Sequence, residues 1–154
     1  MRTTRRTFLW MAGGAVLGSQ TPQPNPVNKW NPSELIRPEE LISTIRDKGP
    51  NKPVIIFTGF MGIYRAGHIS GAVFGGPASS AAGLETLKGA VAKVSKNQEI
   101  VVYCACCPWE ACPNVRPAFE TLHQLGYKQV KGLLIPSNLE LDWVNKGYPL
   151  EKGQ

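Results

Sequence analysis

The sequence predicts a three-layer α/β fold, in which a central, mainly parallel sheet of about five strands carries helices on both faces. Short runs rich in β-branched residues alternate along the chain with longer segments whose apolar residues recur at helical spacing. Such alternation is typical of parallel strands joined by right-handed helical crossovers. The 154 residues, 42% of them hydrophobic, are enough for one domain with a core.

The first half of the domain predicts two strands and a helix. A short strand is expected at 33–36, and a helix from Pro38, because proline suits the first turn of a helix. The Gly-Pro pair at 49–50 is expected to stop this helix. The apolar run at 53–57 predicts a buried strand, and the residues at 58–62 predict a flexible loop after it.

The second half continues the alternation of strands and helices. Asn114 and Asn138 stand where the caps of two helices belong. The expected elements, in order, are turns around a short extended segment at 64–74, an amphipathic helix at about 79–96, a buried strand at 100–103, a helix at 114–125, a strand at 129–134 and a short helix at 139–146.

All four cysteines lie in one short stretch, at Cys104, Cys106, Cys107 and Cys112. This stretch follows the strand at 100–103 and precedes a helix, so the thiols are expected at the carboxyl edge of the sheet, where open α/β sheets bind ligands. Backbone N–H groups at the start of a helix attract anions and lower the pKa of a nearby thiol. The pattern therefore favours thiol chemistry over core packing.

Residues 1–20 predict an export signal peptide, since a charged start precedes a short apolar run. The string TRRTFL at 4–9 is similar to a twin-arginine signal, which implies the twin-arginine export machinery as a partner. We therefore expect a periplasmic or otherwise exported protein with no stable membrane span after cleavage. A lead rich in Pro and Asn is expected at 21–32, before the domain at 33–150.

The charge of the chain argues against a nucleic-acid partner. The formal net charge is +6, and removal of Arg2, Arg5 and Arg6 with the signal lowers it to +3. The sequence also lacks a basic stripe with interleaved aromatic residues.

Four segments together resemble the single-domain rhodaneses, a family of sulfurtransferases. YRAGHISGA at 64–72 is similar to the family's GHIxGA signature, and VVYC at 101–104 resembles the strand that delivers its nucleophilic cysteine. The helix at 114–125, which ends in LGY, and WVNKGYP at 143–149 match the family's later elements. The resemblance implies a rhodanese-like fold, transfer of sulfane sulfur through a cysteine persulfide, and no cofactor. The implied partners are a small sulfur donor and a thiol or cyanide-like acceptor.

The chain departs from this family in ways that bear on its substrate. The Asp and Arg that often follow the second strand are absent from Phe57-Thr58-Gly59-Phe60. The cysteine loop is longer than the family's by about five residues. The related phosphatases need Cys, five residues and then Arg, but Glu110 occupies the cysteine's place before Arg116. These differences exclude a phosphatase and speak against thiosulfate as the natural donor.

The resemblance implies that Cys104 is the nucleophile, activated by loop N–H groups and the following helix. For Arg116 two interpretations stay open, a bidentate contact with an anionic donor or a solvated helix residue. Cys106, Cys107 and Cys112 are candidates for resolving the persulfide or for guarding the loop by a disulfide. Cys107 or Cys112 is also an alternative nucleophile.

For three other residues of the chain, the favoured or alternative interpretation is a structural one. His68 is expected to be a structural residue that hydrogen-bonds to the backbone, and His123 an inert residue on a polar helix face. Trp109 either covers the loop or packs.

The cysteine spacing also supports a second class of function. The pattern C-x-C-C-x4-C, with Cys104, Cys106, Cys107 and Cys112 as alternative metal ligands, offers soft ligands for copper(I) or zinc. A redox-sensing module would use the same thiols. An inactive rhodanese-like scaffold is a third interpretation.

Overall fold

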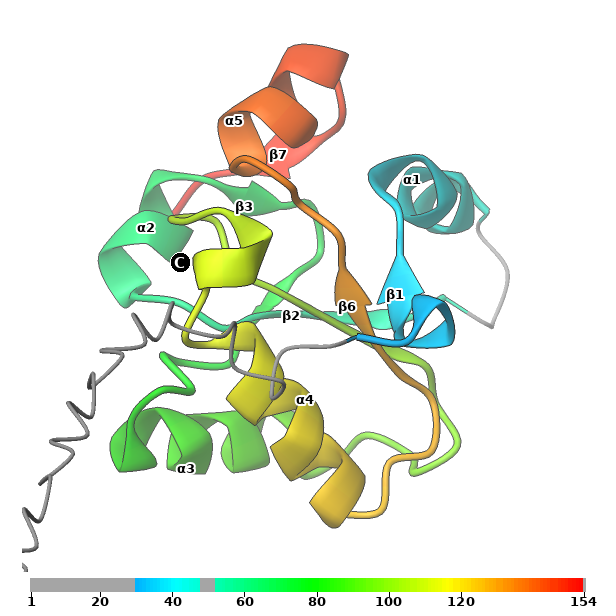
Figure 1. Ribbon diagram of the computed structural model, residues 1–154, viewed down its shortest axis with the longest axis vertical. Helices are drawn as coiled ribbons and strands as arrows, with labels where there is room; N and C mark the ends of the chain where they lie inside the picture. Colours follow the sequence, from blue (N-terminus) through cyan, green and yellow to red (C-terminus); the bar gives the residue numbers. More distant parts are fainter. Residues whose placement is uncertain (1–29, 48–51, 154) are drawn as a thin grey trace, which may run out of the picture.

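The computed structural model describes residues 30–47 and 52–153, and Figure 1 shows their arrangement. The expected export signal at 1–20, most of the lead at 21–32 and the Gly-Pro pair at 49–50 lie outside the described residues. Within the described ranges, no helix has the length and apolar character needed to cross a bilayer.

The central sheet has five strands, and every neighbouring pair in it is parallel. This confirms the predicted, mainly parallel sheet of about five strands. The strands, in their order across the sheet, are β1 (Leu35–Ile36), β6 (Val130–Leu133), β5 (Ile100–Tyr103), β2 (Val54–Phe57) and β4 (Val73–Phe74). Because β5 lies in the middle, all four of its residues are buried.

Helices cover both faces of this sheet and complete the predicted three layers (Figure 1). Three helices lie on one face: α1 (Pro38–Arg46), α2 (Met61–Ala66) and α5 (Leu139–Asp142). Two lie on the other: α3 (Ala81–Val91) and α4 (Val115–Gln124). Short 3-10 helices occur at Pro32–Glu34 (η2), Trp109–Ala111 (η3) and Val144–Lys146 (η4).

The alternation of side chains along β5 decides which face each residue joins. Val101 and Tyr103 pack with α1, α2 and α5, whereas Ile100 and Val102 pack with α3 and α4. Cys104 continues this alternation and belongs to the core on the α3 and α4 face. The end of the strand therefore directs the first cysteine thiol toward the side of the sheet on which α4 lies.

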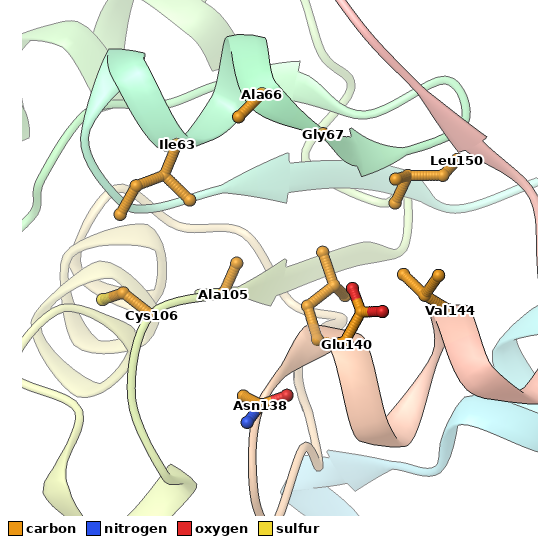
Figure 2. Close-up of a pocket in the computed structure, with 10 residues that line it drawn as sticks. Ile63, Ala66, Gly67, Ala105, Cys106, Asn138, Glu140, Val144 and Leu150 are labelled. Atoms are coloured by element: carbon orange, nitrogen blue, oxygen red, sulfur yellow. The ribbon is translucent and has the colours of Figure 1, made fainter.

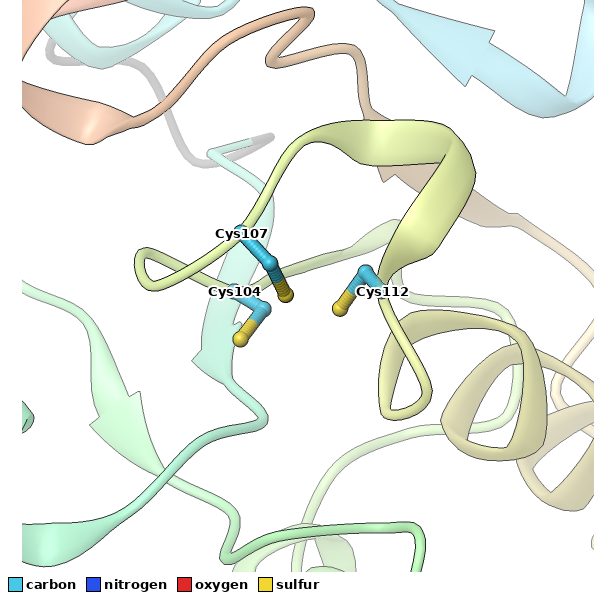
Figure 3. Close-up of side chains that lie close together, drawn as sticks. All are labelled: Cys104, Cys107 and Cys112. Atoms are coloured by element: carbon cyan, nitrogen blue, oxygen red, sulfur yellow. The ribbon is translucent and has the colours of Figure 1, made fainter.

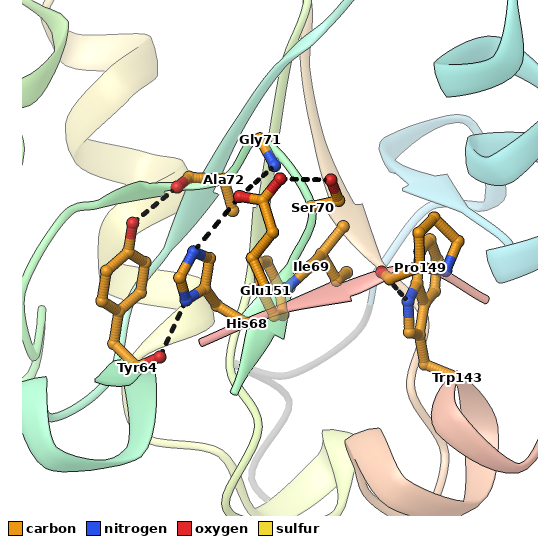
Figure 4. A network of polar contacts seen from close by, with 10 residues as sticks. Tyr64, His68, Ile69, Ser70, Gly71, Ala72, Trp143, Pro149 and Glu151 are labelled. Atoms are coloured by element: carbon orange, nitrogen blue, oxygen red, sulfur yellow. Dashed lines mark hydrogen bonds and ion pairs between the residues drawn. The ribbon is translucent and has the colours of Figure 1, made fainter. Parts of the chain in front are cut away.

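A second, two-stranded sheet pairs β3 (His68–Ile69) with β7 (Leu150–Glu151) in antiparallel fashion. Figure 4 shows the polar contacts around it. The Nδ1–H of the buried His68 donates a hydrogen bond to the Tyr64 carbonyl at 2.8 Å, as expected for a structural histidine. The Tyr64 hydroxyl donates to the Ala72 carbonyl at 2.7 Å, and the Glu151 carboxylate accepts from the Ser70 hydroxyl at 2.6 Å.

The structure differs from the sequence prediction at some element boundaries. The expected flexible loop at 58–62 is shorter, because α2 already begins at Met61 and continues to Ala66. The helix expected at about 79–96 ends at Val91, two residues after Gly89, which favours helix less than other residues do. Strand β7 was not predicted, since its partner strand lies far away in the sequence.

Candidate functional site

The structure brings the four predicted cysteines together at the carboxyl end of β5. Cys104 is only 5% exposed, Cys107 and Cys112 are half-buried, and Cys106 is exposed. The sulfur atoms of Cys104, Cys107 and Cys112 all lie within 4.8 Å of one another (Figure 3). The Cys106 sulfur lies 3.4 Å from that of Cys104. All four, which fall within the described ranges, are free thiols.

The surroundings of Cys104 favour its thiolate. A hydrogen bond from the Cys112 side chain, then the backbone N–H and thiol of Cys106 and the Asn114 amide, lower the pKa of Cys104 from 9.0 to about 5, although burial opposes this. Burial and the contact with Cys104 raise the pKa of Cys106 to about 12. The hydrogen bond to Cys104 also raises the pKa of Cys112. At neutral pH the Cys104 thiolate therefore lies beside the protonated thiols of Cys106 and Cys112.

Asn114 has a different role from the predicted one. Helix α4 does begin directly after it, but its side chain makes no capping hydrogen bond. The buried amide instead accepts a hydrogen bond from the Ser79 N–H at 3.0 Å and directs its Nδ2 toward Cys104 Sγ at 3.9 Å. This side chain thus links the segment before α3 to the thiol. Asn114 therefore occupies the predicted cap position, but its side chain makes a tertiary contact in place of the capping hydrogen bond.

The loop after β2 closes against the same thiol. The Thr58 N–H and hydroxyl both donate to the Tyr103 carbonyl, at 2.7 and 3.1 Å, which fixes this loop to the end of β5. A Cβ atom on Gly59 would lie 2.6 Å from the Phe57 ring and 3.4 Å from Cys104 Sγ. Glycine therefore permits a close approach, which the sequence alone did not reveal.

Aromatic packing holds the long cysteine loop down on the sheet. Trp109, in η3, lies over Gly132 of β6, where a Cβ atom would come within 2.4 Å of the indole. The Trp109 and Trp30 ring centroids are 4.9 Å apart, and Trp30 also meets Phe119 of α4 edge-on at 4.9 Å. Of the two interpretations of Trp109, the structure supports packing.

Arg116 lies in the first turn of α4, and its guanidinium stacks on an aromatic ring. Its Cζ atom is 3.8 Å from the Trp30 ring centroid, and its Nε is 3.9 Å from the Glu120 carboxylate. That Nε has no hydrogen-bond partner within the described part of the chain. The contact of the Arg116 guanidinium with an anionic sulfur donor stays a prediction. His123 is exposed and packs edge-on against Phe119, in keeping with an inert residue.

A cavity of about 430 Å³ lies beside the cysteine loop, between α2 and α5 (Figure 2). Its lining comes from these helices, from η4 and β7, and from the loop. The lining residues are Ile63, Ala66, Gly67, Ala105, Cys106, Asn138, Leu139, Glu140, Val144 and Leu150. No local sequence pattern indicates this cavity, because its walls come from segments that lie far apart in the chain.

The arrangement of sheet and helices is that of rhodanese-like domains. The structure is similar to the Alr3790 protein from Anabaena, at 22% identity and a TM-score of 0.60 over 77% of this chain and 92% of that one. A domain of that protein is described as rhodanese-like. The BH2092 protein from Bacillus halodurans is 21% identical, with a TM-score of 0.62 over 78% of this chain and 77% of that one.

A thiosulfate sulfurtransferase from Pseudomonas aeruginosa is 20% identical, with a TM-score of 0.54 over 78% of this chain but only 20% of its own length. Scans against protein-family models and curated proteins find no match. At these identities the likeness establishes the rhodanese-like fold alone, which confirms the fold expected from the sequence. Because the likeness assigns no reaction to this chain, a proposed reaction has to be based on the positions of its cysteine thiols.

Proposed function

We propose that this protein is an exported rhodanese-like sulfurtransferase that carries sulfane sulfur as a persulfide on Cys104. The observation that carries the proposal is the position of Cys104, buried at the end of the central strand and directly beside hydrogen-bond donors from Cys106, Cys112 and Asn114. A thiolate stabilised in this way attacks sulfur without a dedicated base. The likeness to rhodanese-like domains also supports a scaffold of the sulfurtransferase type.

The proposed reaction needs no redox cofactor. The Cys104 thiolate attacks the outer sulfur of a small sulfane donor and forms a new S–S bond, while the donor's bond to that sulfur breaks and the leaving group keeps the electron pair. A thiolate or cyanide then attacks the outer sulfur, and the Cys104 thiolate leaves. In this proposal Arg116, in the first turn of α4 after the cysteine loop, contributes positive charge near an anionic donor.

Export belongs to the same proposal and rests on the sequence of the first 20 residues. A twin-arginine signal would deliver the folded protein to the periplasm, which is an oxidising compartment.

The test of the proposal is mass spectrometry after a sulfane donor is added. Cys104→Ser is expected to take up no sulfur and to form no thiocyanate from cyanide, because a serine hydroxyl is a poor nucleophile near neutral pH. Cys106→Ser, Cys107→Ser and Cys112→Ser are matched controls, each expected to keep single-turnover transfer to cyanide. Sulfur that stays on Cys104→Ser but is lost from Cys107→Ser or Cys112→Ser would move the nucleophile to another thiol.

A second candidate function is a soft-metal or redox-sensing module. The observation that favours it is the approach of three sulfur atoms, from Cys104, Cys107 and Cys112, to within 4.8 Å of one another. Three thiolates in this arrangement suit copper(I) or zinc. Stoichiometric metal in the purified protein, lost in each of the three single Cys→Ser variants, with no sulfur taken up by the native protein, would favour this candidate over the sulfurtransferase.

A further inference from the structure

The cavity between α2 and α5 has the character of a binding site for a small molecule without negative charge. Apolar side chains form much of its wall, among them Ile63, Leu139, Val144 and Leu150. Among the described residues that line it, Glu140 alone carries a formal charge, and its side chain is exposed. A carboxylate in the lining of this cavity attracts a cation and repels an anion.

Cys106 connects this cavity to the proposed nucleophile. Its residue lines the cavity, lying toward the Ile63 end in Figure 2, and its sulfur is 3.4 Å from Cys104 Sγ. Cys104 itself does not line the cavity and packs with the core on the opposite, α3 and α4 face. A bulky molecule in the cavity would therefore meet the exposed Cys106 thiol and not the buried one.

We propose that Cys106 takes the outer sulfur from a Cys104 persulfide and passes it to a small thiol, with an apolar body and no negative charge, that binds in this cavity. This inference rests on the proposed function, since it needs sulfur to arrive on Cys104 first. Cyanide is small enough to reach Cys104 directly, so its reaction does not require Cys106.

The relay step balances without an oxidant. The Cys106 thiol gives its proton to the anionic outer sulfur of the persulfide, and the resulting Cys106 thiolate attacks that sulfur. A bond forms between Cys106 Sγ and the outer sulfur, the bond to Cys104 breaks, and Cys104 leaves as a thiolate. Because an S–S bond is about 2 Å long, the transferred sulfur needs room between the two thiols, and the exposed Cys106 side chain must turn outward.

The last step releases the sulfur to the acceptor. The acceptor thiol transfers its proton to solvent and attacks the outer sulfur on Cys106, and the Cys106 sulfur leaves and is protonated. The product is the persulfide of the acceptor. Glu140 selects acceptors by charge, since it favours an amine-bearing thiol over one that carries carboxylates.

The experiment follows single-turnover transfer from protein loaded with sulfur from inorganic polysulfide, a sulfane donor. Three acceptors are compared. Cyanide is the small one, 2-(diethylamino)ethanethiol is a cationic thiol with apolar ethyl groups, and mercaptosuccinate is a dianionic thiol. The variants are Cys106→Ser, with Cys106→Ala as a second substitution, and Glu140→Gln. The control is Glu85→Gln, which also removes an exposed carboxylate but lies in α3, on the other face of the sheet.

Cys106→Ser and Cys106→Ala are expected to load sulfur on Cys104 and to form thiocyanate, and this cyanide rate is the internal reference for each variant, because Cys106 also contributes to the low pKa of Cys104. The ratio of their transfer to the cationic thiol over their transfer to cyanide should fall about tenfold or more below the native ratio. Glu140→Gln should lower the preference for the cationic thiol over mercaptosuccinate about threefold, while Glu85→Gln leaves it unchanged. A native ratio of thiol transfer to cyanide transfer in both Cys106 variants would overturn the relay, and an unchanged preference in Glu140→Gln would overturn the acceptor site. Native protein that takes up no sulfur on Cys104 would overturn the proposed function itself, so the failures are distinguishable.

Discussion

Removal of Cys112 is expected to make Cys104 a weaker acid. The hydrogen bond from the Cys112 side chain is the largest cause of the low pKa of Cys104, ahead of the contributions from Cys106 and Asn114. Cys112→Ala removes this donor and leaves the strand, the helix and the Asn114 amide in place. The thiolate of Cys104 should then form at a higher pH.

The size of this effect follows from the pKa values. With a pKa of about 5 instead of 9.0, Cys104 is almost entirely thiolate at neutral pH. Loss of its main donor is expected to raise this pKa by about 1 or more, which corresponds to about 1.4 kcal/mol. At pH 5 the thiolate fraction would fall from about one half to about one tenth, so the alkylation rate of Cys104 should fall about fivefold.

The assay is iodoacetamide alkylation between pH 4 and pH 9, with fragment-ion mass spectrometry to assign the modified cysteine. Cys107→Ala is the matched control, because it also removes a half-buried thiol of the cluster, whereas the hydrogen bonds that lower the pKa of Cys104 come from Cys112, Cys106 and Asn114. Cys112→Ser keeps a hydroxyl donor and should fall between Cys112→Ala and the native protein. An alkylation midpoint for Cys112→Ala equal to that of the native protein would refute the assignment of Cys112 as the main donor.

Three further predictions concern stability, the sheet and export. Because the pKa of Cys104 is lowered from 9.0 to about 5, the unfolded chain binds a proton that the native protein has lost between these values, so the free energy of unfolding should rise with pH across this window. Chemical denaturation should show a smaller rise in Cys104→Ser, and an equal rise would contradict the low pKa. Val102→Asp places an unpaired charge in a fully buried strand and should cost about 3–5 kcal/mol, enough to prevent folding; a soluble variant with an unchanged thermal midpoint would contradict this. Arg5→Lys together with Arg6→Lys should leave uncleaved precursor in the cytoplasm, and normal export of this double variant, followed by immunoblotting of cell fractions, would point to another kind of signal.

Local sequence patterns were enough to predict the main strands and helices. The continuous apolar runs at 53–57 and 100–103 indicated buried strands, and β2 and β5 lie there. Asn138 caps α5 as predicted, with its side chain accepting a hydrogen bond from the Leu141 N–H at 2.9 Å. These features depend on the spacing of neighbouring residues, which the sequence displays directly.

The sequence also placed the candidate site. Four cysteines between a buried strand and a helix have to lie at the carboxyl edge of a parallel sheet, whatever the loop between them does. The structure confirms this position for Cys104, Cys106, Cys107 and Cys112. The signal at 1–20 and its export role remain predictions, since they lie outside the described residues.

Tertiary structure alone decided how the individual side chains are used. Asn114 contacts Ser79, 35 positions earlier in the chain, instead of capping its helix, and Arg116 stacks on Trp30. The exposure of Cys106 beside the buried Cys104 depends on the path of the loop and on the helices that surround the cavity. Such roles depend on contacts between residues distant in sequence, whose energies decide among several locally acceptable conformations, so no local pattern displays them.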